Sequence, residues 1–383
     1  MKSSLKRLLA MLLACCMILG LAACGSSSSD TSSDEEETTT ETTEEAEEAE
    51  EEEAEEAEEE AEEEEAEEES SADDSELGED ECWANLDYAS ADLSGLTIGY
   101  VTINSAAPWG GRIGTEFEAY AESVGATVNV LDANTDADLV TQYCQQMIDS
   151  GVDALVVFGG DITAMAEMAQ IADEAGVAMF MAALDVAEEG REYVKAVVGP
   201  DQYQMCADIA AYVVEQNGTE EDYTVVQING VPFLEDYIER TAGFQEYMAD
   251  YSNYDLSIEP AEAYSSRTDA KTYMENFLTA YDVDIVMGYD DDLTMGAVQA
   301  IEEAGLTGEI KVYSLTGQAD AIQAVIDGQL ELTVMNRADS IAAGLVTAID
   351  EYFSTGSTTY YHRTELTYIT AENAEEYLDQ AEF

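Results

Sequence analysis

The stretch VDALVVFGGDITAMAEMAQIADEAGVAMFMAAL, residues 152–184, decides the fold class. Its two apolar runs, 152–159 and 177–184, are continuous rather than alternating, which predicts strands that are covered on both faces. Between them a helical pattern runs from about Thr163 to Ala175 and ends at Gly176, because a left-handed helix cap favours glycine. Strand, helix and strand in this order indicate a parallel sheet flanked by helices.

The same alternation extends in both directions along the chain. Upstream lie LTIGYVTI (96–103), a helical pattern at about 115–124, ATVNVLDA (126–133) and a second helical pattern at about 136–150. After YVKAVVGPD (193–201) the alternation restarts and continues to ELTYIT (365–370). The sequence therefore predicts two doubly wound α/β lobes. Ligands of such sheets bind where the carboxyl ends of the strands meet, so we expect a cleft between the lobes.

The amino terminus has the pattern of an export signal. Lys2, Lys6 and Arg7 precede an apolar run at 8–23 that is too short to span a bilayer, which is typical of a signal peptide over residues 1–23. The following sequence, Leu21-Ala22-Ala23-Cys24, resembles the lipobox of bacterial lipoprotein signals. That resemblance implies cleavage before Cys24 and a lipid anchor on its thiol. The alternative is a secreted protein in which this cysteine is incidental.

An acidic segment follows the signal peptide. The chain has 86 acidic and 12 basic residues and a formal net charge of −74, and between Asp30 and Glu81 there are 32 acidic residues without any Lys or Arg. Residues 44–69 are only Glu and Ala, and glutamates stacked at i and i+4 disfavour a helix. We therefore interpret residues 24–92 as a disordered acidic tether, with a cation-binding tail as the alternative. The remaining chain is also acidic, which argues against nucleic acid or anionic lipid as a partner.

Cysteine and histidine usage argues against metal sites and most catalysis. Two of the six cysteines belong to the signal peptide and Cys24 to the anchor, and the three that remain are scattered: Cys82, Cys144 and Cys206. They form neither a disulfide framework nor a zinc-binding spacing. Because His362 is the single histidine, the sequence argues against a His-rich metal site and against most Ser/His or Cys/His catalysis. We expect no cofactor, no metal and no enzymatic activity.

From about Leu93 to Phe383 the chain resembles the type I periplasmic binding proteins of the ribose- and sugar-binding branch. The resemblance implies a substrate-binding component of an ABC importer, a lipoprotein in Gram-positive bacteria, acting as a monomer. It also implies three crossings between the lobes, near 199–201, 336–337 and 362–365. The lobes would then be 93–200 with 337–363, and 201–336 with 364–383. The most specific motifs are RTAGFQEYM (240–248), VDIVMGYDDDLTMGAVQAIEEAG (283–305) and IDGQLELTVMNRADSIAAG (326–344).

The resemblance also implies binding residues in the first lobe. In INSAAPWGG (103–111), Asn104 matches a polar contact and Trp109 an aromatic that stacks on a sugar ring, with its N–H free to bond a hydroxyl. Phe158, with Asp161 after it, stands where the family often has a polar contact. Asp185 stands near the position of an Asp-Arg pair, without the arginine. For Trp109 the alternative is an aromatic that only anchors its loop.

In the second lobe, Arg240 occupies the arginine position of the motif. Its planar donors could bind two neighbouring hydroxyls or a carboxylate, and the alternative is a surface salt bridge. Asp290 matches an acceptor of vicinal hydroxyls, while Asp291 and Asp292 are expected to cap the helix that begins there. Two further positions complete the set: Thr316, where the family usually has Asp, and Asn336 at the second crossing.

The function expected from the sequence is capture of a sugar between two lobes and its delivery to a membrane permease with its ATPase subunits. Closure of the lobes around the ligand is the mechanism. The protein would be held at the outer face of the plasma membrane by Cys24. One alternative is a sensor that presents a sugar or autoinducer to a membrane signalling receptor, and another is a binder of nucleoside-type solutes. An enzyme is disfavoured, because the chain has no G-x-G-x-x-G motif and no evident nucleophile–base pair.

Overall fold

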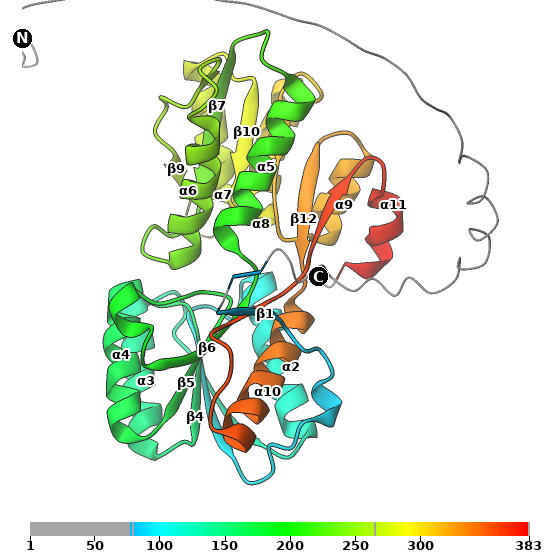
Figure 1. The fold of residues 1–383 in the computed structure, drawn as a ribbon. Coiled ribbons are helices and arrows are strands. Elements are labelled where there is room, and N and C mark those ends of the chain that lie inside the picture. The colour runs from blue at the N-terminus through cyan, green and yellow to red at the C-terminus, as the bar shows by residue number, and fades with distance from the viewer. Residues whose placement is uncertain (1–76, 79, 264–265, 382–383) are drawn as a thin grey trace, which may run out of the picture. The chain divides into compact units, whose positions relative to one another are not determined.

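The computed structural model describes residues 77–78, 80–263 and 266–381. The predicted signal peptide (1–23), Cys24 and the tether up to residue 76 lie outside the described residues. Within them the chain forms two α/β lobes, each built on a largely parallel sheet with helices on both faces (Figure 1), which confirms the predicted fold class. No helix in this part of the chain is long and apolar enough to cross a membrane.

The first lobe is built on a seven-stranded parallel sheet in the order β1-β13-β6-β5-β4-β2-β3. Helices α3 and α4 cover one face and α2 and α10 the other (Figure 1). Its strands are β1 (Glu81–Trp83), β2 (Thr97–Thr102), β3 (Thr127–Asp132), β4 (Ala154–Phe158), β5 (Ala178–Ala182), β6 (Val194–Gly199) and β13 (Tyr361–Arg363). Its helices are η2 (Tyr88–Ser90), α2 (Pro108–Ser123), α3 (Ala137–Ser150), α4 (Ile162–Ala175), η3 (Glu188–Gly190) and α10 (Ala338–Thr355). Every residue of β4 and β5 is buried, as their continuous apolar runs predict.

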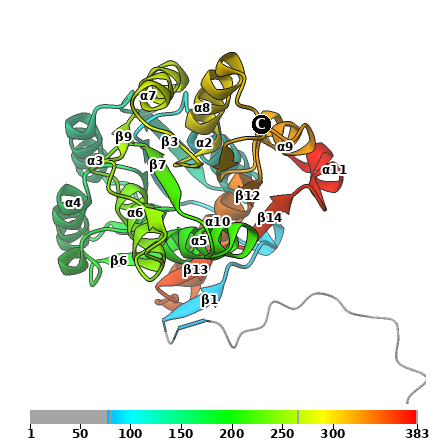
Figure 2. The same ribbon diagram turned by 90° about the horizontal axis from the view of Figure 1, so that it is seen from above.

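The second lobe has the sheet order β14-β12-β11-β10-β7-β8, with β9 beside β7, and β14 runs antiparallel to β12. Helices α5 and α6 pack together on one face, and α7, α8 and α9 lie on the other (Figure 2). Its strands are β7 (Tyr223–Asn229), β8 (Tyr254–Asp255), β9 (Ala261–Glu262), β10 (Ile285–Gly288), β11 (Lys311–Tyr313), β12 (Leu332–Asn336) and β14 (Leu366–Thr370). Its helices are α5 (Gln202–Asn217), α6 (Glu235–Met248), α7 (Arg267–Ala280), α8 (Asp291–Ala304), α9 (Ala319–Ile326), α11 (Ala374–Tyr377) and η4 (Leu378–Gln380).

Apolar packing is organised differently in the two lobes. The first has one large cluster that includes Phe117, Leu155 and Phe180. The second has two clusters, one containing Val286 and Leu293, the other containing Phe244. The free thiols of Cys144 and Cys206 are buried in this packing, as expected of small apolar residues.

The predicted end of the tether at residue 92 is wrong. Residues 81–83 form β1, which lies beside β13 at the edge of the first sheet (Figure 2), and Glu81 forms an ion pair with Arg363. A little further on, Tyr88 stacks on Tyr120 with ring centroids 3.9 Å apart. The rings of Trp83 and Tyr88 supply apolar surface that the Glu- and Ala-rich stretch lacks, so this segment joins the folded unit.

Candidate ligand-binding cleft

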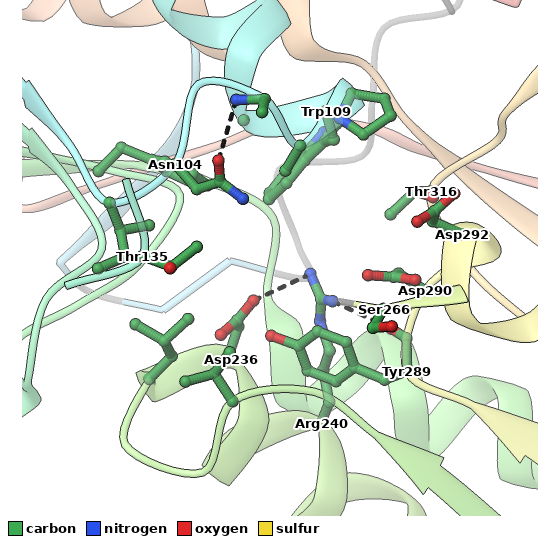
Figure 3. Close-up of a pocket in the computed structure, with 18 of the residues that line it drawn as sticks. Asn104, Trp109, Thr135, Asp236, Arg240, Ser266, Tyr289, Asp290, Asp292 and Thr316 are labelled. Atoms are coloured by element: carbon green, nitrogen blue, oxygen red, sulfur yellow. Dashed lines mark hydrogen bonds and ion pairs between the residues drawn. The ribbon is translucent and has the colours of Figure 1, made fainter. Parts of the chain in front are cut away.

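A cavity of about 500 Å³ lies between the lobes and takes side chains from both (Figure 3). From the first lobe come Asn104, Trp109, Thr135 and Phe158, and from the second Asp236, Arg240, Tyr289 and Asp290. Its remaining lining residues are Ile103, Ala106, Ala107, Pro108, Gly110, Val231, Phe233, Leu234, Ser266, Asp292, Thr316 and Gln318. A volume of this size is in the range of small-molecule sites.

Helix α2 brings Trp109 to the cleft because it begins at Pro108, about two turns before the start predicted near residue 115. Two glycines make this start sterically allowed. A Cβ at Gly110 would lie 2.4 Å from Cε1 of Phe158, and one at Gly111 would lie 2.2 Å from the carbonyl oxygen of Ser105. Any larger residue at either position would push the helix away from the loop and from Phe158.

The indole of Trp109 is held by two contacts. Its Nε1 donates to the carbonyl oxygen of Asn336 at 2.9 Å, and its ring meets Phe158 edge-on with centroids 5.8 Å apart. The N–H is therefore engaged within the protein, and the prediction that it bonds a ligand hydroxyl is wrong. What Trp109 offers to the cleft is ring surface, which suits the C–H face of a sugar.

Arg240 is buried at the second lobe's side of the cleft, with 4% of its surface exposed. Its Nε donates to Oε1 of Gln202 at 2.8 Å and its Nη1 to the carbonyl oxygen of Tyr289 at 3.1 Å, so most of its donor fork is used by the protein. Nη2 has no hydrogen-bond partner among the described residues and lies 3.6 Å from a carboxylate oxygen of Asp236. The alternative of a surface salt bridge is wrong, because the guanidinium is buried.

The three consecutive aspartates have separate roles. Asp290, not Asp291 or Asp292, caps α8 by accepting from the Leu293 N–H at 2.7 Å, which corrects the capping prediction. Asp291 is fully buried and accepts from the backbone N–H of Gln318 and the hydroxyl of Thr333. Burial raises the pKa of Asp290 to about 6 and that of Asp291 to about 7. Of these three aspartates, Asp290 and Asp292 line the cleft and Asp291 does not.

Thr316 lines the cleft with a backbone that threonine rarely adopts. Its φ is 116°, and the next residue, Gly317, has φ 74° and would place a Cβ 2.6 Å from the Cα of Met335. A β-branched residue in this region is strained, and such strain concentrates at binding sites. The hydroxyl of Thr316 accepts from the Asp291 N–H at 3.4 Å.

Three of the predicted contact residues do not line the cleft. Asp161 caps α4 by accepting from the N–H groups of Thr163 and Ala164. Asp185 is buried and accepts from the hydroxyls of Tyr360 and Tyr361, both at 2.7 Å. Asn336 is also buried. Its carbonyl oxygen holds Trp109, and neither side-chain amide atom has a hydrogen-bond partner among the described residues.

Sequence reasoning missed several cleft residues. Tyr289 lies under the Arg240 guanidinium, 4.6 Å from its ring centroid, and burial together with the negative charge of Asp236 raises the pKa of Tyr289 well above its usual value. The sequence carried a signal for Tyr289 and for Asp236. Tyr289 directly precedes Asp290, and Asp236 stands one helical turn before Arg240. For the apolar residues Val231, Phe233 and Leu234, loop composition gave no signal.

Glu235 lies at the start of α6, where the second lobe faces the first. Its Oε2 is buried without a hydrogen-bond partner in the described chain. Burial is the largest cause that raises the pKa of Glu235 from 4.5 to about 8, and the negative charges of Asp236, Glu239 and Asp185 add to it. Asp185 itself forms an ion pair with Arg191. The folded chain thus holds a proton that the unfolded chain releases above about pH 4.5. The free energy of unfolding therefore falls, through Glu235, as the pH rises from about 4.5 to about 8.

Searches against known proteins found similarity over most of the folded part. The family model described as "Periplasmic binding protein domain" matches residues 98–357. The ribose import binding protein RbsB of Bacillus subtilis is 28% identical over 235 residues, covering 61% of this chain and 74% of the relative. The galactofuranose-binding protein YtfQ of Escherichia coli is 24% identical over 269 residues, covering 68% and 83%.

A solved galactofuranose-binding protein has the same fold. Its crystal structure superposes with a TM-score of 0.70 at 23% identity, covering 74% of this chain and 98% of the other. At this identity the likeness establishes the fold alone. In the part of the chain that the structure describes, no group of three or more His, Cys, Asp or Glu could hold a metal ion.

Proposed function

Because the chain belongs to the periplasmic binding protein domain family, we propose that it is an extracytoplasmic solute-binding protein that captures a sugar and delivers it to the permease and ATPase subunits of an ABC importer. One observation carries the proposal. Trp109 of the first lobe and Arg240 of the second line the same cavity, with the guanidinium 5.9 Å from the indole centroid. A ligand that touches both stabilises the closed arrangement of the lobes.

The lobes move as two bodies, residues 81–200 with 337–363 and residues 201–336 with 364–383. Sheet membership supports these boundaries. Consecutive strands β6 and β7 belong to different sheets, as do β12 and β13, and β13 and β14, so the chain passes between the lobes three times. Three short crossings that absorb the backbone rotation are what hinge closure needs.

Recognition is non-covalent. The indole face of Trp109 packs on the C–H face of the sugar, and the carboxylate of Asp290 accepts from its hydroxyls. Asn104 adds a polar contact from the opposite lobe, and Nη2 of Arg240 adds one donor. The sugars after which the two relatives are named, ribose and galactofuranose, support a monosaccharide.

The protein is exported, cleaved before Cys24 and anchored by a lipid on that thiol, as a monomer at the outer face of the plasma membrane. The lipobox-like sequence Leu21-Ala22-Ala23-Cys24 supports this proposal. Replacing Cys24→Ser should move the protein from the membrane fraction to the medium, and mass spectrometry of the wild type should show the lipid. A Cys24→Ser chain that stays in the membrane fraction would refute the anchor.

Ligand binding is tested by a thermal-shift screen of the chain from residue 24 with Cys24→Ser, against monosaccharides, disaccharides and nucleosides. At least one sugar should raise the melting temperature. Asp290→Asn should then weaken binding at least tenfold, since it removes a charged acceptor from the cleft yet leaves an amide that can still cap α8. Asp161→Asn is the matched control, because Asp161 caps α4 outside the cleft.

Two results would count against the proposal. If no sugar shifts the melting temperature while a nucleoside does, the sugar assignment fails. If Asp161→Asn weakens binding as much as Asp290→Asn, the cleft is not the binding site.

A further inference from the structure

The cleft has an apolar wall and a group of charged side chains, and the neutral polar residues Asn104 and Thr135 also line it. In the apolar wall, Leu234 belongs to the same packed cluster as Trp109 and Phe158, and Val231 and Phe233 pack against that cluster. These three residues form the loop between β7 and α6, so the second lobe extends an apolar wall that starts in the first. We call Val231, Phe233 and Leu234 the apolar loop.

The charged groups gather in one part of the second lobe's wall. Figure 3 shows Asp236, Arg240, Tyr289 and Asp290 close together, across the cavity from Trp109. Each positive charge there is matched by a carboxylate, and one carboxylate is in excess. Arg240 is paired with Asp236 at 3.6 Å, Asp290 adds a further carboxylate, and Asp292 is paired with Arg267 at 2.8 Å. Within the described residues, Arg240 and Arg267 each already face a carboxylate, so an added carboxylate or phosphate would meet surplus negative charge. Nη2 of Arg240 remains a donor for a neutral hydroxyl.

From this arrangement we infer that the cleft selects neutral deoxy sugars, which present hydroxyls on one edge and a methyl group on the other, and rejects sugar acids and sugar phosphates. The inference rests on the proposed sugar-binding function and names the ligand class. A hydroxymethyl group placed against the apolar loop would lose hydrogen bonds to water, and the side chains of Val231, Phe233 and Leu234 offer it no partner in exchange. A methyl group in the same place would gain from burial.

The expected preference is at least tenfold. One buried hydroxyl without a partner costs enough to lower affinity by one to two orders of magnitude. The apolar loop is the element that sets this preference, and Phe233 is its largest side chain.

The test uses sugar pairs that differ by one hydroxyl, titrated calorimetrically into the chain from residue 24 with Cys24→Ser. Suitable pairs are D-fucose with D-galactose, L-fucose with L-galactose and L-rhamnose with L-mannose, with D-galacturonate and galactose 6-phosphate as anionic probes. In at least one pair the deoxy sugar should bind at least tenfold more tightly, and neither anion should bind. In a Phe233→Ser chain that ratio should fall toward one, whereas Phe353→Ser, the same change at an exposed site on α10, should keep it.

The outcomes separate this inference from the proposed function. If the parent hexoses bind as well as or better than the deoxy sugars, or if an anion binds, the inference is overturned and sugar binding stands. If no sugar binds at all, both fail. Should Phe233→Ser not fold, the ratios measured on the unmodified cleft still decide the matter.

Discussion

Asp185 offers a sharp test of the difference between a binding residue and a structural one. Its side chain is 4% exposed and accepts from four donors: the Val186 N–H, the hydroxyls of Tyr360 and Tyr361, and Nε of Arg191 at 2.9 Å. Through these contacts it joins the loop after β5 to the segment that enters β13. Asp185→Ala removes every one of these contacts while leaving the cleft lining unchanged.

The expected loss follows from the two tyrosines. Each hydroxyl left without a partner costs about 1–2 kcal/mol, since both rings are half-buried and water can reach them in part. Arg191 has 46% of its side chain exposed, so its lost ion pair adds little. The sum is about 3 kcal/mol, which corresponds to a fall of roughly 6 °C in melting temperature for a chain of this size.

Melting temperature and ligand affinity should be measured on the same preparations. Asp282→Ala, at an exposed aspartate, is the control and should change neither. Adding Tyr361→Phe to Asp185→Ala should cost little more, because its hydroxyl has already lost its partner. The reasoning is refuted if Asp185→Ala lowers the melting temperature by less than 2 °C, or if it abolishes ligand binding at unchanged stability.

Three further predictions concern stability. The melting temperature should fall between about pH 5 and 9, because the raised pKa of Glu235 makes the folded chain retain a proton, and Glu235→Gln should flatten that profile in differential scanning calorimetry. Gly243→Ala should cost about 3 kcal/mol by urea titration, since the new Cβ would lie 2.1 Å from the carbonyl oxygen of Tyr203 and force α5 and α6 apart. Glu81→Ala should cost about 2 kcal/mol, because it leaves the half-buried Arg363 without its nearest carboxylate, and an unchanged unfolding midpoint would contradict this.

Elements specified by local pattern were predictable. The buried strands β4 and β5 follow from their continuous apolar runs, and Gly151 and Gly176 end α3 and α4 with φ near 75° because a left-handed cap favours glycine. The first turn of α2 was not predictable, since the glycine pair Gly110-Gly111 weakens a helical pattern. The reason for that pair is the closeness of Phe158 and Ser105, which only the folded chain brings about.

Site residues were predictable where a motif placed them and not where distant partners decide. Asp185 is held by tyrosines about 175 positions away in the chain. Among the three aspartates at 290–292, Asp291 is the buried one, and it accepts a hydrogen bond from Thr333, some 40 positions downstream. Sequence reasoning could name the cluster of aspartates, but the assignment of cap, buried acceptor and cleft residue needs the folded contacts.

The edge strand β1 determines where a mechanical load enters the molecule. It runs parallel to β13, with Tyr361 N–H donating to the Asp80 carbonyl and Ala84 N–H to that of Arg363. A pull on the chain before Asp80 acts along this ladder, so its hydrogen bonds share the force instead of breaking one after another. Since β13 continues directly into β14 of the other lobe, tension would reach the connection between the lobes before it reached either core.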